Sequence, residues 1–275
     1  MKGKKNTIVV KVGTSVLSYN KGISEESIKN IAYQISDLVK DDKAFVLVSS
    51  GAILSGITIL GLTTTPHDLN LTNKQVCASI GQPYLMGLYE KYFGKKGITT
   101  AQMLFTEEDL ANKIAYKNVW RTLNALLERN VVPIINENDA VSVRELLPVN
   151  PYVPDEVRFG DNDRLSAIIA SKLRSQLLIM LSDVDGYYDI TENGSKKLVK
   201  EIKVLNSGVM KFAEGKGHFG RGGMKSKLQA ARIVAETGIE VIIANGKKKD
   251  ILKDILSGKD IGTRILPITR KGYRI

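Results

Sequence analysis

The sequence predicts an α/β protein, a three-layer αβα sandwich with a mostly parallel central sheet, from three observations. Short apolar runs that suit buried strands alternate with longer segments of helical periodicity. Several strand runs are apolar throughout, which is typical of parallel strands that helices cover on both faces. No internal repeat, low-complexity tract or long linker divides the chain. We therefore expect a single domain over residues 1–275.

The first half of the chain begins and ends with a buried strand. Its clearest helix places Ile28, Ile31, Ile35 and Leu38 on one face, and Ser-Glu-Glu-Ser from Ser24 is a typical helix start. In chain order we expect a strand over 7–12, a helix over 24–40, a strand over 44–50, a small-residue helix after Gly51, helices over 73–93 and 116–128, and a strand over 131–136.

The second half repeats the pattern of a helix followed by a buried strand. In chain order we expect a helix over 166–172, a strand over 177–182, a helix over 224–236 and a strand over 241–244, with loops or hairpin tips at 150–154 and 191–197.

Composition excludes several classes of protein. The chain has 275 residues, 43% hydrophobic and 25% charged, which is ordinary for a folded soluble protein. No segment has the roughly 18 uninterrupted apolar residues of a membrane helix. The apolar run near the start contains Lys11 and is too short for a signal peptide. Cys77 is the only cysteine, so an internal disulfide is excluded and a reducing cytoplasm is expected.

The formal net charge of +11 would attract nucleic acid or anionic small molecules. The basic residues are scattered, with short clusters at 2–5 and 247–249, and no nucleic-acid motif accompanies them. A solvated basic surface is therefore favoured over an RNA-binding one, and its field would also favour a polyanionic substrate.

Small or polar residues end four of the expected strands. They are found at 11–15, 49–51, 136–139 and 182–183. Polar turns alone would account for any one of these ends, but less well for all four. Because ligands of open parallel sheets bind outside the carboxyl ends of the strands, we expect a site at this edge.

Lys11 and the segment 220–227 are candidates for binding an anion. Lys11 either reaches water from an edge strand or holds a charge beside an anion cradle of Gly13 and the next amides. Glycines that open a helix at 220–227, followed by Lys225 and Lys227, suit phosphate binding. The GxGxxG match at 215–220 follows a helical segment rather than a strand, and no P-loop pattern is present.

Two acidic segments lie at the same expected edge. Asp161, Asn162 and Asp163 precede a helix, where they either cap it or bind and catalyse. Residues 136–139 form either a turn cluster or contacts to the amino group of a substrate. Neither His67 nor His218 lies in a ligand-spaced cluster, so no metal site is expected from protein side chains.

Taken together, these segments resemble the glutamate 5-kinase branch of the amino-acid kinase superfamily. The match runs in order over essentially the whole chain, and three blocks of it are specific: INENDAV from Ile135, GDNDRLSA from Gly160 and GGMKSKLQAA from Gly222. The weaker blocks are VVKVGTSVL from Val9, VSSGAI from Val48, SIGQ from Ser79, AQMLFT from Ala101 and LSDVDGYY from Leu181.

The resemblance implies the amino-acid kinase fold and ATP-dependent phosphorylation of the γ-carboxylate of L-glutamate, the first step of proline biosynthesis. It implies that Lys11 and Lys227 neutralise the transferred phosphoryl group and that Asp163 holds both lysines. The implied glutamate-binding residues are Ser50, Gly51, Asp139, Asp161 and Asn162. The implied nucleotide-binding residues are Lys11, Gly13, Ser182, Asp183, Arg221, Gly222, Gly223, Met224, Lys225, Ser226 and Lys227.

Two positions depart from the family pattern. Ser182 stands where many members have threonine, which keeps the hydroxyl. Arg221 stands where a small residue is common, which leaves its contact with the nucleotide open. Mg²⁺ is expected to be held mainly through the phosphates of ATP.

The resemblance also implies organisation and partners. Residues 1–165 would bind glutamate and 166–275 would bind the nucleotide, in the short form that lacks the C-terminal PUA domain of other members. A dimer or tetramer of identical chains and feedback inhibition by L-proline are expected, without nucleic-acid or membrane partners. The alternatives are a sister kinase that acts on aspartate, acetylglutamate or UMP, and a catalytically silent amino-acid sensor. RNA binding is suggested only by the net charge.

Overall fold

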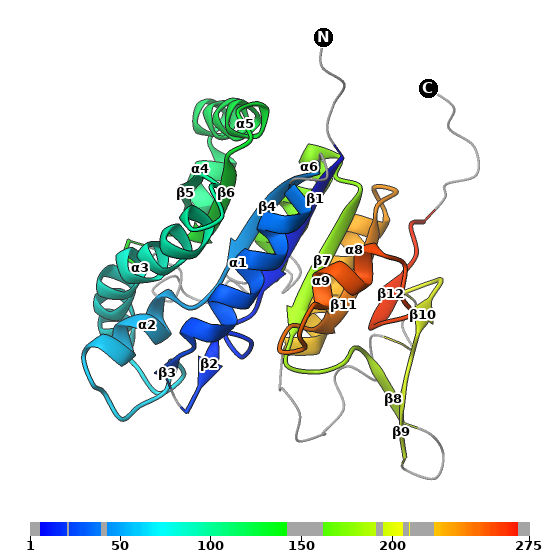
Figure 1. The fold of residues 1–275 in the computed structure, drawn as a ribbon, viewed down its shortest axis with the longest axis horizontal. Helices are drawn as coiled ribbons and strands as arrows, with labels where there is room; N and C mark the ends of the chain where they lie inside the picture. The colour runs from blue at the N-terminus through cyan, green and yellow to red at the C-terminus, as the bar shows by residue number, and fades with distance from the viewer. Residues whose placement is uncertain are drawn as a thin grey trace, which may run out of the picture.

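The computed structural model describes residues 6–20, 22–39, 43–141, 162–190, 195–205, 209 and 223–268. Within these, one eight-stranded sheet has the spatial order β10-β12-β11-β7-β1-β4-β6-β5. Its strands are labelled in Figure 1. Among its described pairings, β11 and β12 are antiparallel and the rest are parallel. Its strands are β1 (Thr7–Val12), β4 (Ala44–Ser49), β5 (Thr100–Phe105), β6 (Val132–Glu137), β7 (Leu177–Ser182), β10 (Glu201–Ile202), β11 (Glu240–Asn245) and β12 (Thr263–Ile265).

Helices and two small hairpins complete the described fold. The hairpins pair β2 (Ser18–Tyr19) with β3 (Gly22–Ile23) and β8 (Tyr188–Ile190) with β9 (Lys196–Leu198). The helices are α1 (Glu25–Val39), α2 (Ala52–Ile59), α3 (Leu71–Gly94), α4 (Glu107–Ala111), α5 (Lys113–Glu128), α6 (Asn162–Leu173), α8 (Gly223–Ala235) and α9 (Ile251–Leu256).

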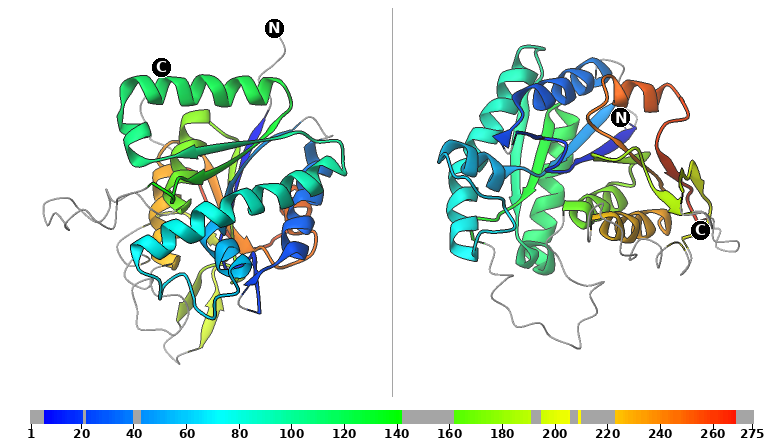
Figure 2. Two further views of the ribbon diagram at one scale, coloured as in Figure 1. Left: turned by 90° about the vertical axis from the view of Figure 1, so that its left-hand side faces the viewer. Right: turned by 90° about the horizontal axis from the view of Figure 1, so that it is seen from below.

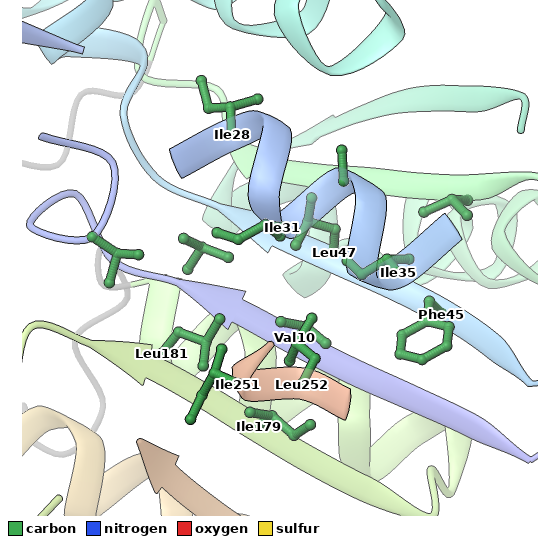
Figure 3. Close-up of a cluster of buried hydrophobic side chains, with 14 of the residues drawn as sticks. Val10, Ile28, Ile31, Ile35, Phe45, Leu47, Ile179, Leu181, Ile251 and Leu252 are labelled. Atoms are coloured by element: carbon green, nitrogen blue, oxygen red, sulfur yellow. The ribbon is translucent and has the colours of Figure 1, made fainter. Parts of the chain in front are cut away.

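Helices cover both faces of the sheet, so the predicted three-layer sandwich is confirmed. One buried cluster joins Val10 of β1 to apolar side chains of α1, α3 and α9, and Figure 3 shows Val10 below Ile31 and beside Leu252. The other cluster joins Val9 to α5, α6 and α8. Figure 2, in its right-hand view, shows the two helical layers on opposite sides of the sheet.

The alternation of side chains along β1 explains which face of the sheet Lys11 occupies. Successive side chains of a strand face opposite sides of the sheet. Because Val10 and Val12 belong to the cluster under α1, and Val9 to the cluster under α6, Lys11 shares the α6 face with Val9. Its side chain is 4% exposed, so Lys11 does not reach water as an edge-strand lysine would.

The expected elements are found with their ends shifted by a few residues. The largest change is α6, which begins at Asn162 rather than at residue 166. Nine of the described elements were not predicted as helices or strands: β2, β3, β5, β8, β9, β10, β12, α4 and α9. The edge strand β5 mixes exposed and buried side chains, while β12 has three residues and α9 has six, too few for a periodicity to be recognised.

Helices α2 and α3 approach each other so closely that only glycine fits between them. A Cβ atom on Gly56 would lie 2.0 Å from the carbonyl oxygen of Cys77, and one on Gly81 would lie 1.9 Å from that of Ala52. Pro83, inside α3, has no N–H to donate to the carbonyl of Ser79. The close approach at Gly56 and Gly81 fixes the start of α2 beside the middle of α3.

Candidate functional site

The polar strand ends predicted from the sequence meet at the carboxyl edge of the sheet. Lys11 on β1 lies between Val48 on β4 and Met180 on β7. Asn136 and Ser182 stand at or next to the last residues of β6 and β7, whose arrowheads lie at one edge in Figure 1. This edge is therefore the candidate active site.

Two lysines share one buried aspartate at this edge. The Nζ atom of Lys11 lies 2.6 Å from Oδ1 of Asp163, and the Nζ atom of Lys227 lies 3.1 Å from Oδ2. The three residues come from β1, the first turn of α6 and the first turn of α8. Asp163 is 1% exposed and both lysines are also buried.

The charges of this cluster do not cancel. Burial alone would raise the pKa of Asp163, but the ammonium groups of Lys11 and Lys227 outweigh burial and hold the pKa below its ordinary value. The aspartate is therefore ionised at neutral pH. Two ammonium groups against one carboxylate leave a surplus positive charge, which suits an anionic ligand.

The first turn of α8 is tied to the same carboxylate. The Ser226 hydroxyl donates to Oδ2 of Asp163 at 3.1 Å. Lys227 also donates to the carbonyl oxygen of Gly223 at 3.2 Å. These bonds fix the start of α8, including Met224 and Lys225, against α6.

A chain of side-chain hydrogen bonds runs beside the charged cluster. The Nδ2 group of Asn162 donates to the Ser50 hydroxyl at 3.0 Å and to Oδ1 of Asn136 at 2.9 Å. Nδ2 of Asn136 in turn donates to Oε1 of Gln82, on α3, at 3.0 Å. Asn162 and Asp163 are neighbours, so the chain and the charged cluster share one helix start. We call these four side chains, Ser50, Asn162, Asn136 and Gln82, the polar chain.

Two glycines contribute space and backbone geometry. The N–H of Gly13 donates to the carbonyl oxygen of Leu181 at 3.1 Å, so it is not free for the anion cradle expected from the sequence. A Cβ at Gly13 would lie 3.7 Å from Nζ of Lys11, and glycine leaves that space open. Gly51, with a φ of 109°, is the N-cap of α2, in a conformation that favours glycine.

The predicted nucleotide residues after β7 form a polar turn. The Ser182 hydroxyl donates to Oδ1 of Asp183 at 3.2 Å. Hydrogen bonds from Lys248 and Asn245 lower the pKa of Asp185. The same hydrogen bonds fix this turn to the end of β11. Tyr187, just after this turn, packs in the core at 4% exposure.

The remaining predicted residues are Asp139 and three that lie outside the described residues. Asp139 is half-buried in the turn after β6. Asp161, Arg221 and Gly222 fall outside the described residues. Asp163 lies in the first turn of α6, which begins at Asn162, and both of its carboxylate oxygens face lysines.

Sequence reasoning gave no site role to Gln82 and named Asn136 only as one of residues 136–139, a turn cluster or a set of contacts to the amino group of a substrate. Gln82 appeared only within SIGQ. Both are buried, at 1% and 8% exposure. The one available signal was a glutamine on the apolar face of a helix, between Ala78 and Leu85, where a polar side chain needs a partner.

Two properties of the described residues bear on metals and membranes. They contain no group of three or more His, Cys, Asp or Glu side chains placed to hold a metal ion. No described helix is both long enough and apolar enough to cross a membrane.

Comparison with known proteins gives a family and a fold. Residues 6–245 match the amino acid kinase family. The chain is 41% identical over 269 residues to a glutamate 5-kinase of Clostridium perfringens, with 96% of each chain covered. It is 40% identical over 258 residues to a glutamate 5-kinase of Thermus thermophilus, covering 93% of this chain and 66% of that one.

Among solved structures, the chain resembles a carbamate kinase of Giardia lamblia bound to AMP-PNP, with a TM-score of 0.63 and 18% identity, covering 95% of this chain and 98% of that one. It also resembles the UMP kinase of Ureaplasma parvum, with a TM-score of 0.61, 17% identity and coverage of 95% and 99%. At these identities the two structures show a shared fold.

Proposed function

The chain belongs to the amino acid kinase family, in its glutamate 5-kinase branch, and we propose on this premise that it phosphorylates the γ-carboxylate of L-glutamate. The phosphoryl donor is ATP, and the product is L-glutamyl 5-phosphate, which begins proline biosynthesis. The observation that carries the proposal is the pair of ammonium groups, Lys11 and Lys227, joined through Asp163.

The reaction requires charge neutralisation more than it requires proton transfer. An oxygen of the γ-carboxylate forms a bond to the γ-phosphorus, and the bond from that phosphorus to the oxygen bridging it to the β-phosphorus breaks, releasing ADP. A carboxylate is already ionised at neutral pH, so no general base is needed. Its repulsion by the triphosphate is the obstacle, and positioned cations reduce it most where charge is redistributed in the transition state.

In the proposed arrangement Lys11 and Lys227 approach the transferred group from two sides. Asp163 holds both ammonium groups in position and restricts their flexible stems. The surplus positive charge of the cluster supports this role. Asp163 acts through the lysines, which would contact the phosphoryl group themselves.

The amino-acid substrate would lie beside the polar chain. Asn162 and Ser50 are joined there by a hydrogen bond, and Gly51 begins the neighbouring helix α2. We place Asp139 and Asp161 in the same site on the resemblance alone. The proximity of Asn162 to Asp163 supports a glutamate whose γ-carboxylate reaches the lysines.

The nucleotide would lie over the turn after β7 and the start of α8. We assign it Gly13, Ser182, Asp183 and, by the resemblance, the loop residues Arg221 and Gly222. On α8 the assigned residues are Gly223, Met224, Lys225, Ser226 and Lys227. The residues through 165 would thus serve glutamate and those from 166 the nucleotide, within one domain.

Mg²⁺ would neutralise part of the phosphate charge when ATP is bound. A phosphate-held ion that keeps several waters needs few protein ligands. The described residues, which lack a cluster of three or more metal-binding side chains, fit that form of binding.

Three further properties belong to the proposal. The family supports a homodimer or homotetramer, which light scattering would test, and L-proline as a feedback inhibitor, which inhibition assays at low glutamate would test. The single cysteine supports a cytoplasmic location.

The deciding experiment is glutamate-dependent formation of ADP with Mg-ATP, with hydroxylamine present to trap the acyl phosphate. We expect ADP and hydroxamate in equal amounts and only when glutamate is added. Aspartate, acetylglutamate and UMP are the control acceptors. Turnover with one of them but not with glutamate would identify a sister kinase, and ADP release with none would identify a silent sensor.

A further inference from the structure

The polar chain ends in a buried acceptor without a donor. Both N–H groups of Asn162 are used, one on the Ser50 hydroxyl and one on Oδ1 of Asn136. Its own Oδ1 is shielded from solvent and accepts no hydrogen bond within the described part of the chain. Buried polar atoms are almost always paired, so this oxygen is suited to a ligand that donates.

The orientation of Asn162 depends on its neighbour Asn136. A side-chain amide donates from its nitrogen and accepts at its oxygen. Asn136 offers its oxygen to Asn162 because its nitrogen faces the other way, toward Oε1 of Gln82 at 3.0 Å. The Ser50 hydroxyl can donate or accept, so it holds Asn162 in place without fixing which end of the amide faces the site.

Gln82 therefore stands at the start of the polar chain, where its own Nε2 is also buried and has no hydrogen-bond partner among the described residues. It is buried on α3 at 8% exposure, and the described contacts join it to Asn136 rather than to Asn162. Without an acceptor at position 82, Asn136 can turn its amide over. Asn162 would then follow and present N–H groups to the site in place of Oδ1.

The geometry points to Gln82 as a positioning residue that sets substrate specificity. By holding Asn136 it keeps Oδ1 of Asn162 aimed at the site, where it accepts a hydrogen bond from the α-ammonium group of an amino-acid substrate. A dicarboxylate without that group gains nothing from the arrangement. This inference rests on the proposed function, and it names what that site distinguishes.

The test compares L-glutamate with glutarate, which lacks only the α-amino group. In Gln82→Leu we expect the KM for glutamate to rise at least about tenfold, the scale of one hydrogen bond to a charged group. The Ki of glutarate as an inhibitor competitive with glutamate should stay within about twofold, because glutarate never used that bond. The preference for glutamate over glutarate would be lost, while the KM for ATP would stay the same.

Gln34→Leu is the matched control. Gln34 is also a buried glutamine on a helix, and its Oε1 accepts from the backbone N–H of Leu252 at 2.8 Å, outside the polar chain. The change removes the same side-chain amide from a buried position on a helix, so we expect the glutamate-to-glutarate preference of the unaltered chain.

A second variant keeps the test decisive if Gln82→Leu does not fold. Gln82→Glu retains an acceptor facing Asn136 and should keep the preference for glutamate, whereas Gln82→Met, similar in length but without an acceptor, should lose it. A parallel rise in both constants, unchanged constants in the leucine and methionine variants, or lost preference in Gln82→Glu would each overturn the inference. The absence of glutamate-dependent ADP from the unaltered enzyme would instead overturn the proposed function.

Discussion

Oδ1 of Asp163 lies 2.6 Å from the Nζ atom of Lys11, and this contact is buried beneath the carboxyl edge of the sheet. The ion pair occupies one oxygen of the carboxylate and leaves the other to Lys227. A buried charge pair is a weak stabilising device, because desolvation offsets most of the attraction. A cluster with a surplus cation is therefore better explained by an anionic ligand than by stability.

Replacing the shared carboxylate should reduce turnover. In Asp163→Asn the two ammonium groups lose the opposite charge that holds them in place, so we expect kcat to fall by at least about tenfold. Coupled ADP-release kinetics with both substrates saturating would measure it. A wild-type kcat in this variant would rule out the organising role of Asp163.

Lys227→Ala should lower kcat by well over tenfold, since contacts to transition-state charge are typically worth several kcal/mol. Steady-state kinetics with varied glutamate and ATP would separate kcat from KM. The control is Lys203→Ala, which removes a lysine that is 79% exposed and should leave both constants unchanged. An effect confined to the KM for glutamate would contradict a role in phosphoryl transfer.

The charged cluster should also make stability depend on pH in the acid range. The pKa of Asp163 is lowered in the folded state from a reference of 3.8, so the folded chain favours the ionised form. The resulting stabilisation is fully present above about pH 4 and is lost as the pH falls through the folded pKa. At neutral pH we expect Asp163→Asn to reduce the free energy of unfolding by about 3–5 kcal/mol, because it leaves two buried ammonium groups unpaired.

Urea unfolding of the two proteins between pH 7 and pH 3 checks this prediction. The difference between their free energies of unfolding should stay constant down to about pH 4 and then narrow. A difference that persists or widens at the acid end would show that the carboxylate is not stabilised in its ionised form.

Local signals predicted the layers of the fold and marked each member of the charged cluster as a candidate, but not the contacts between them. Lys11 was a candidate because a lysine inside an apolar strand needs a partner. The pairing could not be read locally, since the three residues are far apart in the sequence, Asp163 and Lys227 alone by 64 positions, and it came from family resemblance. Gln82 meets Asn136 across 54 residues, and nothing in the residues around either one encodes that contact. Periodicity reports which face of a helix is buried, whereas a site depends on which faces meet.

The glycine contact between α2 and α3 gives a prediction with an internal control. In Gly81→Ala the new Cβ would lie 1.9 Å from the carbonyl oxygen of Ala52 and 2.3 Å from the amide nitrogen of Gly56. Both are backbone atoms, so the helices must separate, at a cost of about 3 kcal/mol or more. Because α2 begins beside Ser50 and α3 carries Gln82, the KM for glutamate should rise in the fraction that folds.

The control is Gly87→Ala on the same helix, where the new Cβ meets nothing within 4 Å. This change should stabilise the chain by up to about 1 kcal/mol. Thermal and urea unfolding would measure both changes, and equal stabilities for the two variants would show that the close approach of α2 to α3 does not hold in solution.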